Sequence, residues 1–368
     1  MVFTDRGLNH MSEPFKAVMR DLNSVLSEAY NAKQAILLPG SGTFAMEAVA
    51  RQLGYDNDVL VVRNGFFSYR WTDIFEQGDF VNGEYVHKAQ PDAAGGDLPQ
   101  FGPPPIEEVV AAIKELKPSA VFAPQVETSV GLQIPDEYIK QLADAVHAVG
   151  GHMVLDCIAA GTVWVEMEAL GVDFLVTAPQ KGWSSPACAG VVMVSEAGRE
   201  VVLKTKSSSM ALNLGKWMGV MDAYLADSGP GHSYYSTMPT DCLRLFRDTA
   251  QETRDFGWQK SKDKAIEMGT KVRAMLASKG FKSVAAPAYA APGVVVVYTD
   301  DAKMYAKLGA AGLQVAAGVP WKIGEKTAPG QTFRMGLFGL DKLADVDGTV
   351  KRLEAGIDAA MAAGPVGV

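Results

Sequence analysis

The chain of 368 residues is long enough for one large domain and a smaller one, each with a buried core. Hydrophobic residues make up 48% of it and charged residues 21%, a balance typical of folded globular proteins that excludes disorder as the main theme. The net charge of −8 argues against nucleic acid or an anionic membrane as a partner, because both would require a basic surface.

No apolar run reaches the roughly 18 residues that a membrane-spanning helix needs, and the opening Met-Val-Phe-Thr-Asp-Arg lacks the hydrophobic region of a signal peptide. These features predict a cytoplasmic protein that does not contact a membrane. The cysteines Cys157, Cys188 and Cys242 are scattered, so neither a disulfide framework nor a metal site is indicated.

Short apolar runs alternate with amphipathic stretches over the first 200 or so residues. Helical patterns begin near Thr43, cover 106–116 and follow Pro135. The runs are rich in β-branched residues and apolar on both faces, as in strands buried within a mostly parallel sheet. They cover residues 35–38, 58–62, 120–123, 152–155, 174–177 and 190–194. This alternation predicts an α/β fold with ligands at the carboxyl ends of the strands.

The pattern changes after about residue 258. A long helix is expected through 260–279, strands at 293–298 and 332–336, and a closing helix with Val346, Val350, Leu353 and Ile357 on one face. We therefore predict a large domain of residues 1–257 and a smaller α+β domain of residues 258–368.

Two charged residues follow predicted strands in the first domain. Lys181 lies in a small-residue loop after the strand at 174–177, and Asp156 ends the strand at 152–155. A lone lysine after a strand is ordinarily a solvated surface charge, and an aspartate there can simply cap a following helix. Strand ends are nevertheless where the active sites of open sheets form, so both are candidates.

A glycine-rich turn supplies a third candidate element. Ser41-Gly42-Thr43 links a buried strand to a helix, and glycines at such a turn let backbone N–H groups and the helix dipole meet a phosphate. The motif alone is weak, and it is neither the dinucleotide fingerprint nor a Walker loop. A phosphate cradle, a strand-end carboxylate and a strand-end amine are together what pyridoxal 5′-phosphate (PLP) chemistry requires.

Six motifs in order carry a resemblance to a known family. They are Gly40-Ser41-Gly42-Thr43, Asn64-Gly65-Phe66-Phe67, Glu127-Thr128-Ser129-Val130-Gly131, Asp156, Gln180-Lys181 and Phe333-Arg334-Met335-Gly336. In this the chain resembles the class V aminotransferases, in their alanine–glyoxylate and serine–pyruvate branch. The resemblance implies fold type I, with a mostly parallel seven-stranded sheet in the large domain and a smaller C-terminal α+β domain.

The resemblance also implies roles for individual residues. Lys181 would bind PLP as an imine and then move a proton on the substrate, and Asp156 would pair with the pyridine nitrogen. Phe67 would stack on the cofactor ring unless it is an ordinary core residue. Thr128 would bind the phenolic oxygen or a substrate group, although its neighbour Ser129 competes for that assignment.

The phosphate and the substrate have implied ligands as well. Those for the phosphate from the same chain are Ser41, Gly42, Thr43 and Gln180. Tyr234 and Thr237 would reach it from the second subunit of a homodimer with shared active sites. Arg334 would clamp the substrate α-carboxylate through two parallel hydrogen bonds.

The chain departs from the family at its start, which lacks the usual Pro-Gly-Pro segment beside the substrate pocket. His10 either helps to replace that wall or is a packing histidine. Trp71, Trp183 and Trp321 are either further pocket walls or core residues.

The leading hypothesis is a PLP-dependent aminotransferase that moves an amino group from serine or alanine to glyoxylate or pyruvate. The runner-up is another PLP reaction on the same scaffold, as in a lyase, an epimerase or an aminoethylphosphonate transaminase. A desulfurase is disfavoured because neither Cys157 nor Cys188 suits a mobile nucleophile. A non-catalytic sugar- or nucleotide-binding α/β protein is the alternative of a different class.

Overall fold

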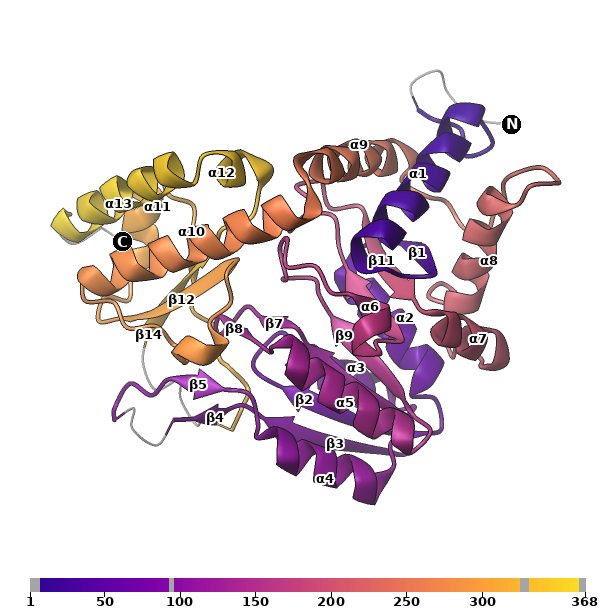
Figure 1. Cartoon of the computed structure of the whole chain (residues 1–368), viewed down its shortest axis with the longest axis horizontal. Coiled ribbons are helices and arrows are strands. Elements are labelled where there is room, and N and C mark those ends of the chain that lie inside the picture. The colour runs from indigo at the N-terminus through magenta and orange to yellow at the C-terminus, as the bar shows by residue number, and fades with distance from the viewer. Residues whose placement is uncertain (1–6, 93–95, 325–330, 364–368) are drawn as a thin grey trace.

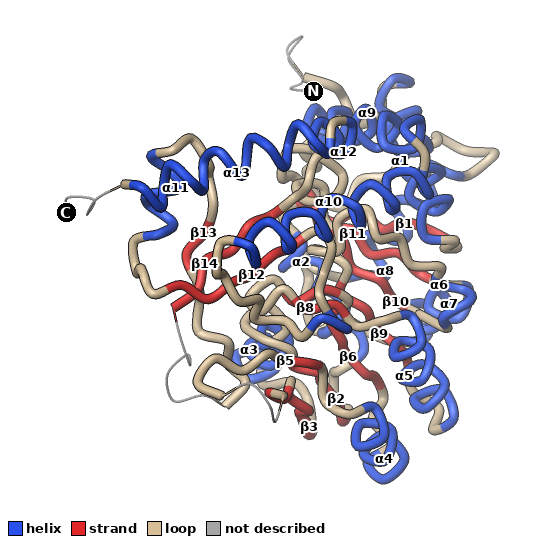
Figure 2. Tube along the Cα trace, turned by 60° about the vertical axis from the view of Figure 1, so that its left-hand side comes forward, coloured by secondary structure: helices blue, strands red, loops and turns tan. Residues whose placement is uncertain are grey.

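The computed structural model describes residues 7–92, 96–324 and 331–363 (Figures 1 and 2). A large sheet with helices on both faces occupies one side of the molecule, and a small sheet beneath long helices occupies the other (Figure 1). The strands of the large sheet, in spatial order, are β1 (Gln34–Pro39), β11 (Ala189–Val194), β10 (Phe174–Thr177), β9 (His152–Asp156), β6 (Ala120–Pro124), β2 (Asp58–Arg63) and β3 (Gly83–Lys88).

The large sheet is mostly parallel, as predicted. Only β11 runs against its neighbours, pairing antiparallel with both β1 and β10. The six predicted strands are confirmed, and β3 is a seventh that the apolar-run criterion missed. Its residues are half-buried or exposed, because it lies at the edge of the sheet and is paired only with β2.

Helices cover both faces of this sheet. The helices of this part of the chain are α1 (Glu13–Tyr30), α2 (Gly42–Leu53), α3 (Tyr69–Gly78), α4 (Ile106–Leu116), α5 (Asp136–Ala148), α6 (Met167–Leu170), α7 (Glu196–Lys204), α8 (Leu214–Leu225) and α9 (Thr240–Phe256). In Figure 1, α4 and α5 lie in front of the sheet, with α2 and α3 behind it. Short strands β4 (Gln90–Pro91), β5 (Phe101–Gly102), β7 (Val126–Glu127) and β8 (Leu132–Gln133) form two small ladders.

The long N-terminal helix α1 shows how local sequence sets an element boundary. Ser12 accepts a hydrogen bond from the Phe15 backbone N–H at 3.4 Å, and Pro14 lies in the first turn, where its missing N–H costs nothing. The helix ends at Asn31, which adopts the left-handed conformation with φ of 47°. Its apolar side packs against β1 and the helices beside it.

The C-terminal part is built on a three-stranded antiparallel sheet in the order β12-β14-β13. Its elements are α10 (Trp258–Ser278), the 3₁₀ turn η1 (Pro287–Tyr289), β12 (Val294–Thr299), α11 (Met304–Ala310), β13 (Ala316–Ala317), β14 (Gln331–Gly336), α12 (Leu340–Ala344) and α13 (Val346–Ala362). A separate cluster of buried residues, drawn from 265–360, holds these elements together. Gly257, with φ of 100°, joins α9 to α10. On these facts we propose that the smaller domain begins at residue 258.

The topology gathers the carboxyl ends of three strands at one edge. Asp156 at the end of β9 lies opposite Val176 near the end of β10, so the loop that carries Lys181 begins beside it. Strand β1 runs in the same direction as β10, since each is antiparallel to β11, and it ends at the glycine-rich turn. None of the helices in the described ranges is both long enough and apolar enough to cross a membrane.

Candidate active site

A cavity of about 240 Å³ lies at this edge of the large sheet. It is lined by Ser41, Gly42, Thr43, Met46, Phe67, Arg70, Val126, Thr128, Asp156, Ile158, Ala159, Gln180 and Lys181. Eight of the residues singled out from the sequence are therefore brought together, although they lie as far apart in the chain as Ser41 and Lys181.

The N-terminus of α2 forms one wall of the cavity. Ser41 is the residue before the helix and has an extended backbone, and its side chain makes no capping hydrogen bond. The hydroxyl and the first backbone N–H groups of the helix are therefore available to an anion. The turn requires glycine at position 40 for two reasons. Its φ of 128° is unfavourable for any residue with a Cβ, and a Cβ there would lie 2.8 Å from the Phe44 ring.

Asp156 lies at the bottom of the cavity, almost fully buried. Its Oδ1 accepts one hydrogen bond, from the Ile158 backbone N–H at 2.9 Å. Burial raises the pKa of Asp156 to about 7, with a further contribution from the charge of Glu127, while Arg70 acts in the opposite direction. Among the described residues no cation forms an ion pair with this carboxylate, so a cationic ligand group placed beside it would be strongly favoured.

Lys181 is half-buried at the rim. Burial lowers its pKa, and the positive charges of Arg334 and Arg70 lower it further. Its Nζ lies 5.9 Å from the centre of the Phe338 ring, and within the described part of the chain no carboxylate pairs with it. At neutral pH, a larger fraction of a lysine in such surroundings is in the neutral, nucleophilic form than is the case for a surface lysine.

The loop that carries Phe67 is held in place by the fully buried carboxylate of Glu127. The backbone N–H groups of Phe67 and Ser68 donate to it at 3.2 and 2.9 Å, and the Ser68 hydroxyl donates at 2.8 Å. The Glu127 Oε1 that accepts from Phe67 also accepts from the backbone N–H and the hydroxyl of Ser129 at 2.9 and 2.7 Å. Gly65 is required here, since a Cβ on it would lie 2.1 Å from the Ser129 Oγ.

This network separates the two candidate hydroxyls. Thr128 lines the cavity, whereas the Ser129 Oγ is engaged with Glu127 and with the Phe66 backbone N–H, which donates to it at 2.9 Å. The geometry therefore supports Thr128 as the ligand-binding residue. The sequence motif contained Glu127, but its part in holding the loop was not foreseen.

Arg70 is the charged residue of the cavity lining that was not singled out from the sequence. Its Nη1 donates to the Thr43 Oγ1 at 3.1 Å, and its guanidinium lies 4.9 Å from the centre of the Phe67 ring. An arginine in the first turn of a helix has no distinctive sequence signature. Its one sequence cue is its place three residues after Phe67, just inside the helix that follows the Phe67 turn.

Arg334 reaches the same region from β14 in the C-terminal part. Its Nε donates to the Ala317 carbonyl at 2.9 Å, and its guanidinium lies 5.6 Å from the centre of the Phe67 ring. Burial lowers the pKa of Arg334, while the charge of Glu127 acts in the opposite direction. Arg334 is close enough to lower the pKa of Lys181, but it is not among the residues that line the cavity.

Tyr234 and Thr237 lie away from the cavity of their own chain. The Tyr234 side chain is 62% exposed, and its hydroxyl is 3.3 Å from the Thr237 Oγ1. His10 packs beside Tyr234, with ring centres 5.5 Å apart, and does not line the cavity either. The tryptophans Trp71, Trp183 and Trp321 are fully buried core residues rather than pocket walls.

The fold and the site define a class of enzyme. A mostly parallel seven-stranded sheet with an amine, a buried carboxylate and a helix N-terminus at one edge is the architecture of a fold type I transferase. Residues 3–214, more than half of the chain, match the model of the family described as Aminotransferase class-V. The chain belongs to this family of PLP-dependent aminotransferases.

Individual proteins agree with this assignment. The chain is 25% identical to alanine–glyoxylate aminotransferase 1 of Saccharomyces cerevisiae over 85% of its own length and 81% of that protein. It is 22% identical to a 2-aminoethylphosphonate–pyruvate transaminase of Syntrophobacter fumaroxidans over 88% and 84%. The structure of ureidoglycine–glyoxylate aminotransferase from Bacillus subtilis superimposes with a TM-score of 0.81 at 19% identity, covering 97% of this chain and 88% of that one.

Proposed function

We propose that this aminotransferase binds PLP in the 240 Å³ cavity and transfers the amino group of a small amino acid, alanine or serine, to glyoxylate or pyruvate. One observation carries the proposal: Lys181, Asp156 and the N-terminus of α2 line the same cavity. The substrate class is supported by the activity of the yeast relative, an alanine–glyoxylate aminotransferase.

The residues of the cavity fit the cofactor on their own chemistry. The free Ser41 hydroxyl and the α2 N-terminus suit a phosphate, with Gly42, Thr43 and Gln180 beside them. Asp156 is a buried carboxyl group with no cationic partner among the described residues, which suits a protonated pyridine nitrogen. Phe67 offers a ring to stack on, and Lys181 an amine for covalent attachment.

Each residue then has a defined task. Bound PLP supplies an electron sink for the bond broken at the substrate Cα. Asp156 would keep the ring nitrogen protonated, and the Lys181 amine would carry the proton between the substrate Cα and the cofactor C4′. Arg334 binds the α-carboxylate and so orients the Cα–H bond toward Lys181. Glu127 holds the loop that carries Phe67 against Ser129, the residue next to Thr128.

We further propose a homodimer in which Tyr234 and Thr237 reach the phosphate bound in the other subunit. Their exposure supports this, as does Phe44, which is 48% exposed in the first turn of α2 beside the cradle. Replacing Tyr234 by Phe should weaken cofactor binding without altering the mass of the assembly. Light scattering that gives a monomer would contradict the proposal.

A single-turnover experiment tests the reaction. Cofactor-loaded enzyme mixed with L-alanine and no acceptor should release one equivalent of pyruvate per site and then stop, because the amino group stays on the enzyme. Adding glyoxylate should restart turnover with formation of glycine. Continuous release of ammonia from L-serine would identify a lyase instead, and formation of D-alanine an epimerase.

A further inference from the structure

A second and larger cavity, of about 550 Å³, lies in the C-terminal part of the molecule. One wall is α10, and the opposite wall is the segment 281–292, which includes η1. The lining is mainly apolar and includes Ile266, Ala274, Ala277, Phe281 and Val297. Its volume is within the range of about 300 to 1,000 Å³ typical of small-molecule sites.

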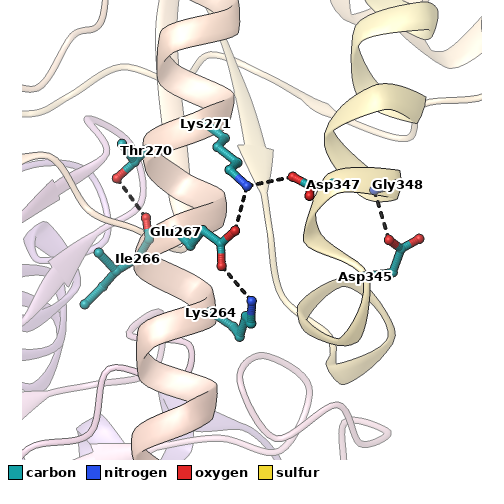
Figure 3. A network of polar contacts seen from close by, with 8 residues as sticks. All are labelled: Lys264, Ile266, Glu267, Thr270, Lys271, Asp345, Asp347 and Gly348. Atoms are coloured by element: carbon teal, nitrogen blue, oxygen red, sulfur yellow. Dashed lines mark hydrogen bonds and ion pairs between the residues drawn. The ribbon is translucent and has the colours of Figure 1, made fainter.

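The cavity lies on the side of α10 that is turned away from α13. In Figure 3 Lys264, Glu267 and Lys271 project toward α13, whereas Ile266 and Thr270 project from the opposite side of the helix. Both of these last residues line the cavity, and the Ile266 side chain is 43% exposed. The apolar face of α10 on this side is thus left uncovered by the protein's own helices.

Two basic residues, Arg273 and Lys282, belong to this mostly apolar lining, and Arg273 is the one whose contacts define a polar corner. Arg273 donates through Nη2 to the carbonyls of Ala291 and Val294, the latter at 2.9 Å, and through Nη1 to the Ser283 Oγ at 3.4 Å. All three acceptors are neutral. Across the described ranges no aspartate or glutamate forms an ion pair with Arg273, and burial lowers its pKa to about 10.

A charge in such surroundings is costly unless an opposite charge accompanies it. The three hydrogen bonds occupy three of the five guanidinium N–H groups, which leaves donors for a further acceptor. Gln100 helps to shape this polar corner, since its Nε2 donates to the Ser283 and Ala285 carbonyls at 3.1 and 3.2 Å. The cavity therefore combines a large apolar volume with a cationic corner at Arg273, and Lys282 adds a second basic residue to the lining.

We propose that this cavity is a second ligand site, distinct from the catalytic one, that binds a small carboxylate with an apolar body. The carboxylate lies at Arg273 and Ser283, and the apolar body lies along Ala274, Ala277 and Phe281. The proposal does not depend on the reaction catalysed at Lys181, because the two cavities share no lining residue.

Titration calorimetry on the PLP-loaded enzyme tests the proposal with decanoate and decan-1-ol, which differ in the charged head group. Decanoate should bind at least tenfold more tightly than the alcohol, and Arg273→Met should remove most of that preference even though Lys282 remains in the lining. Equal binding of the two compounds, or no binding of either, would overturn the proposal.

Because Arg273 also holds the 291–294 segment, a second variant avoids it. Ala274→Phe fills the cavity from an exposed position of α10 and should weaken decanoate binding at least tenfold. The matched control Ala355→Phe lies on an exposed position of α13 outside the cavity and should bind as the wild type does. Unchanged binding by Ala274→Phe would place decanoate elsewhere, and a changed assembly mass would assign the groove to a second copy of the chain; either result overturns the proposal.

Discussion

The catalytic edge of the large sheet and the α10–α13 face differ in whether their charged side chains form ion pairs. At the α10–α13 face the Lys271 Nζ lies 2.6 Å from both the Glu267 and the Asp347 carboxylates, and the Lys264 Nζ lies 2.7 Å from Glu267 (Figure 3). At the catalytic edge Lys181 and Asp156 are buried to different degrees and pair with no opposite charge among the described residues.

The pKa values record this difference. Hydrogen bonds from Lys264 and Lys271 lower the pKa of Glu267 to about 2, whereas burial raises that of Asp156 to about 7. At the α10–α13 face the charged residues pair with one another. At the catalytic edge they become paired only when a ligand supplies the opposite charges. Burying charged groups without partners costs free energy, and a cofactor that supplies the opposite charges removes that cost. The site is therefore selective for a cofactor of matching charge.

The largest expected effect concerns the pH dependence of the cofactor-free protein. The pKa of Asp156 is raised by folding, so its neutral form stabilises the fold at acid pH, and this contribution is lost as the pH rises toward 7. The difference in the free energy of unfolding between Asp156→Asn and the wild type should therefore shift in favour of the variant by a few kcal/mol from about pH 5 to about pH 8. Urea unfolding at the two pH values measures this, and parallel pH profiles for the two proteins would contradict it.

Arg334→Ala should raise the KM for the amino donor by about a hundredfold, since it removes one partner of a charged, doubly hydrogen-bonded pair. The cofactor should remain bound, because Arg334 does not line the cavity. Arg334→Lys should recover only part of the loss, as a point charge cannot make the paired contact. An unchanged KM would remove Arg334 from the substrate site.

Glu127→Gln should lower kcat by about tenfold. In the wild type both carboxylate oxygens accept from backbone N–H groups, whereas in the variant the amide NH₂ group would face some of these donors. The loop that carries Phe67 would shift, and with it the cofactor. A merely structural role would lower the melting temperature alone. The distinguishing measurement is the near-ultraviolet circular dichroism of the bound cofactor, which should weaken while the far-ultraviolet spectrum stays unchanged.

The smallest effect is expected at the α10–α13 face. Lys271→Ala should shift the melting temperature by no more than about 2 °C, because exposed ion pairs gain little over solvent. Activity should stay at the wild-type level. A large loss of either would mean that this face is coupled to the catalytic edge, and the contrast between the two regions would fail.

Much of the fold could be predicted from the sequence because strands that are buried on both faces leave a clear record in it. Strands such as β6 and β11 are apolar on both faces, so short continuous apolar runs mark them. Strand β3 leaves no such record, since it lies at the sheet edge and contains Glu84, His87 and Lys88. The assignment of seven strands came from the family resemblance and not from the periodicity.

The site was predictable where a residue type is demanded by chemistry and not where it is demanded by geometry. Lys181 and Asp156 follow predicted strands, and the topology alone brings strand ends together. Arg70 and the hydrogen bonds of Glu127 depend on how two loops meet in space, which no local pattern encodes. For the same reason, nothing in the sequence indicated Arg273 or its cavity.

The central claim is that Lys181 is the amine that binds the cofactor. Borohydride reduction of the PLP-loaded protein, followed by proteolysis and mass spectrometry, tests it directly, with Lys181→Ala as the control. We expect one pyridoxyl group per chain, on the peptide that contains Lys181, and none in the variant. A label on a different lysine of the wild type, or the absence of any label, would contradict the account.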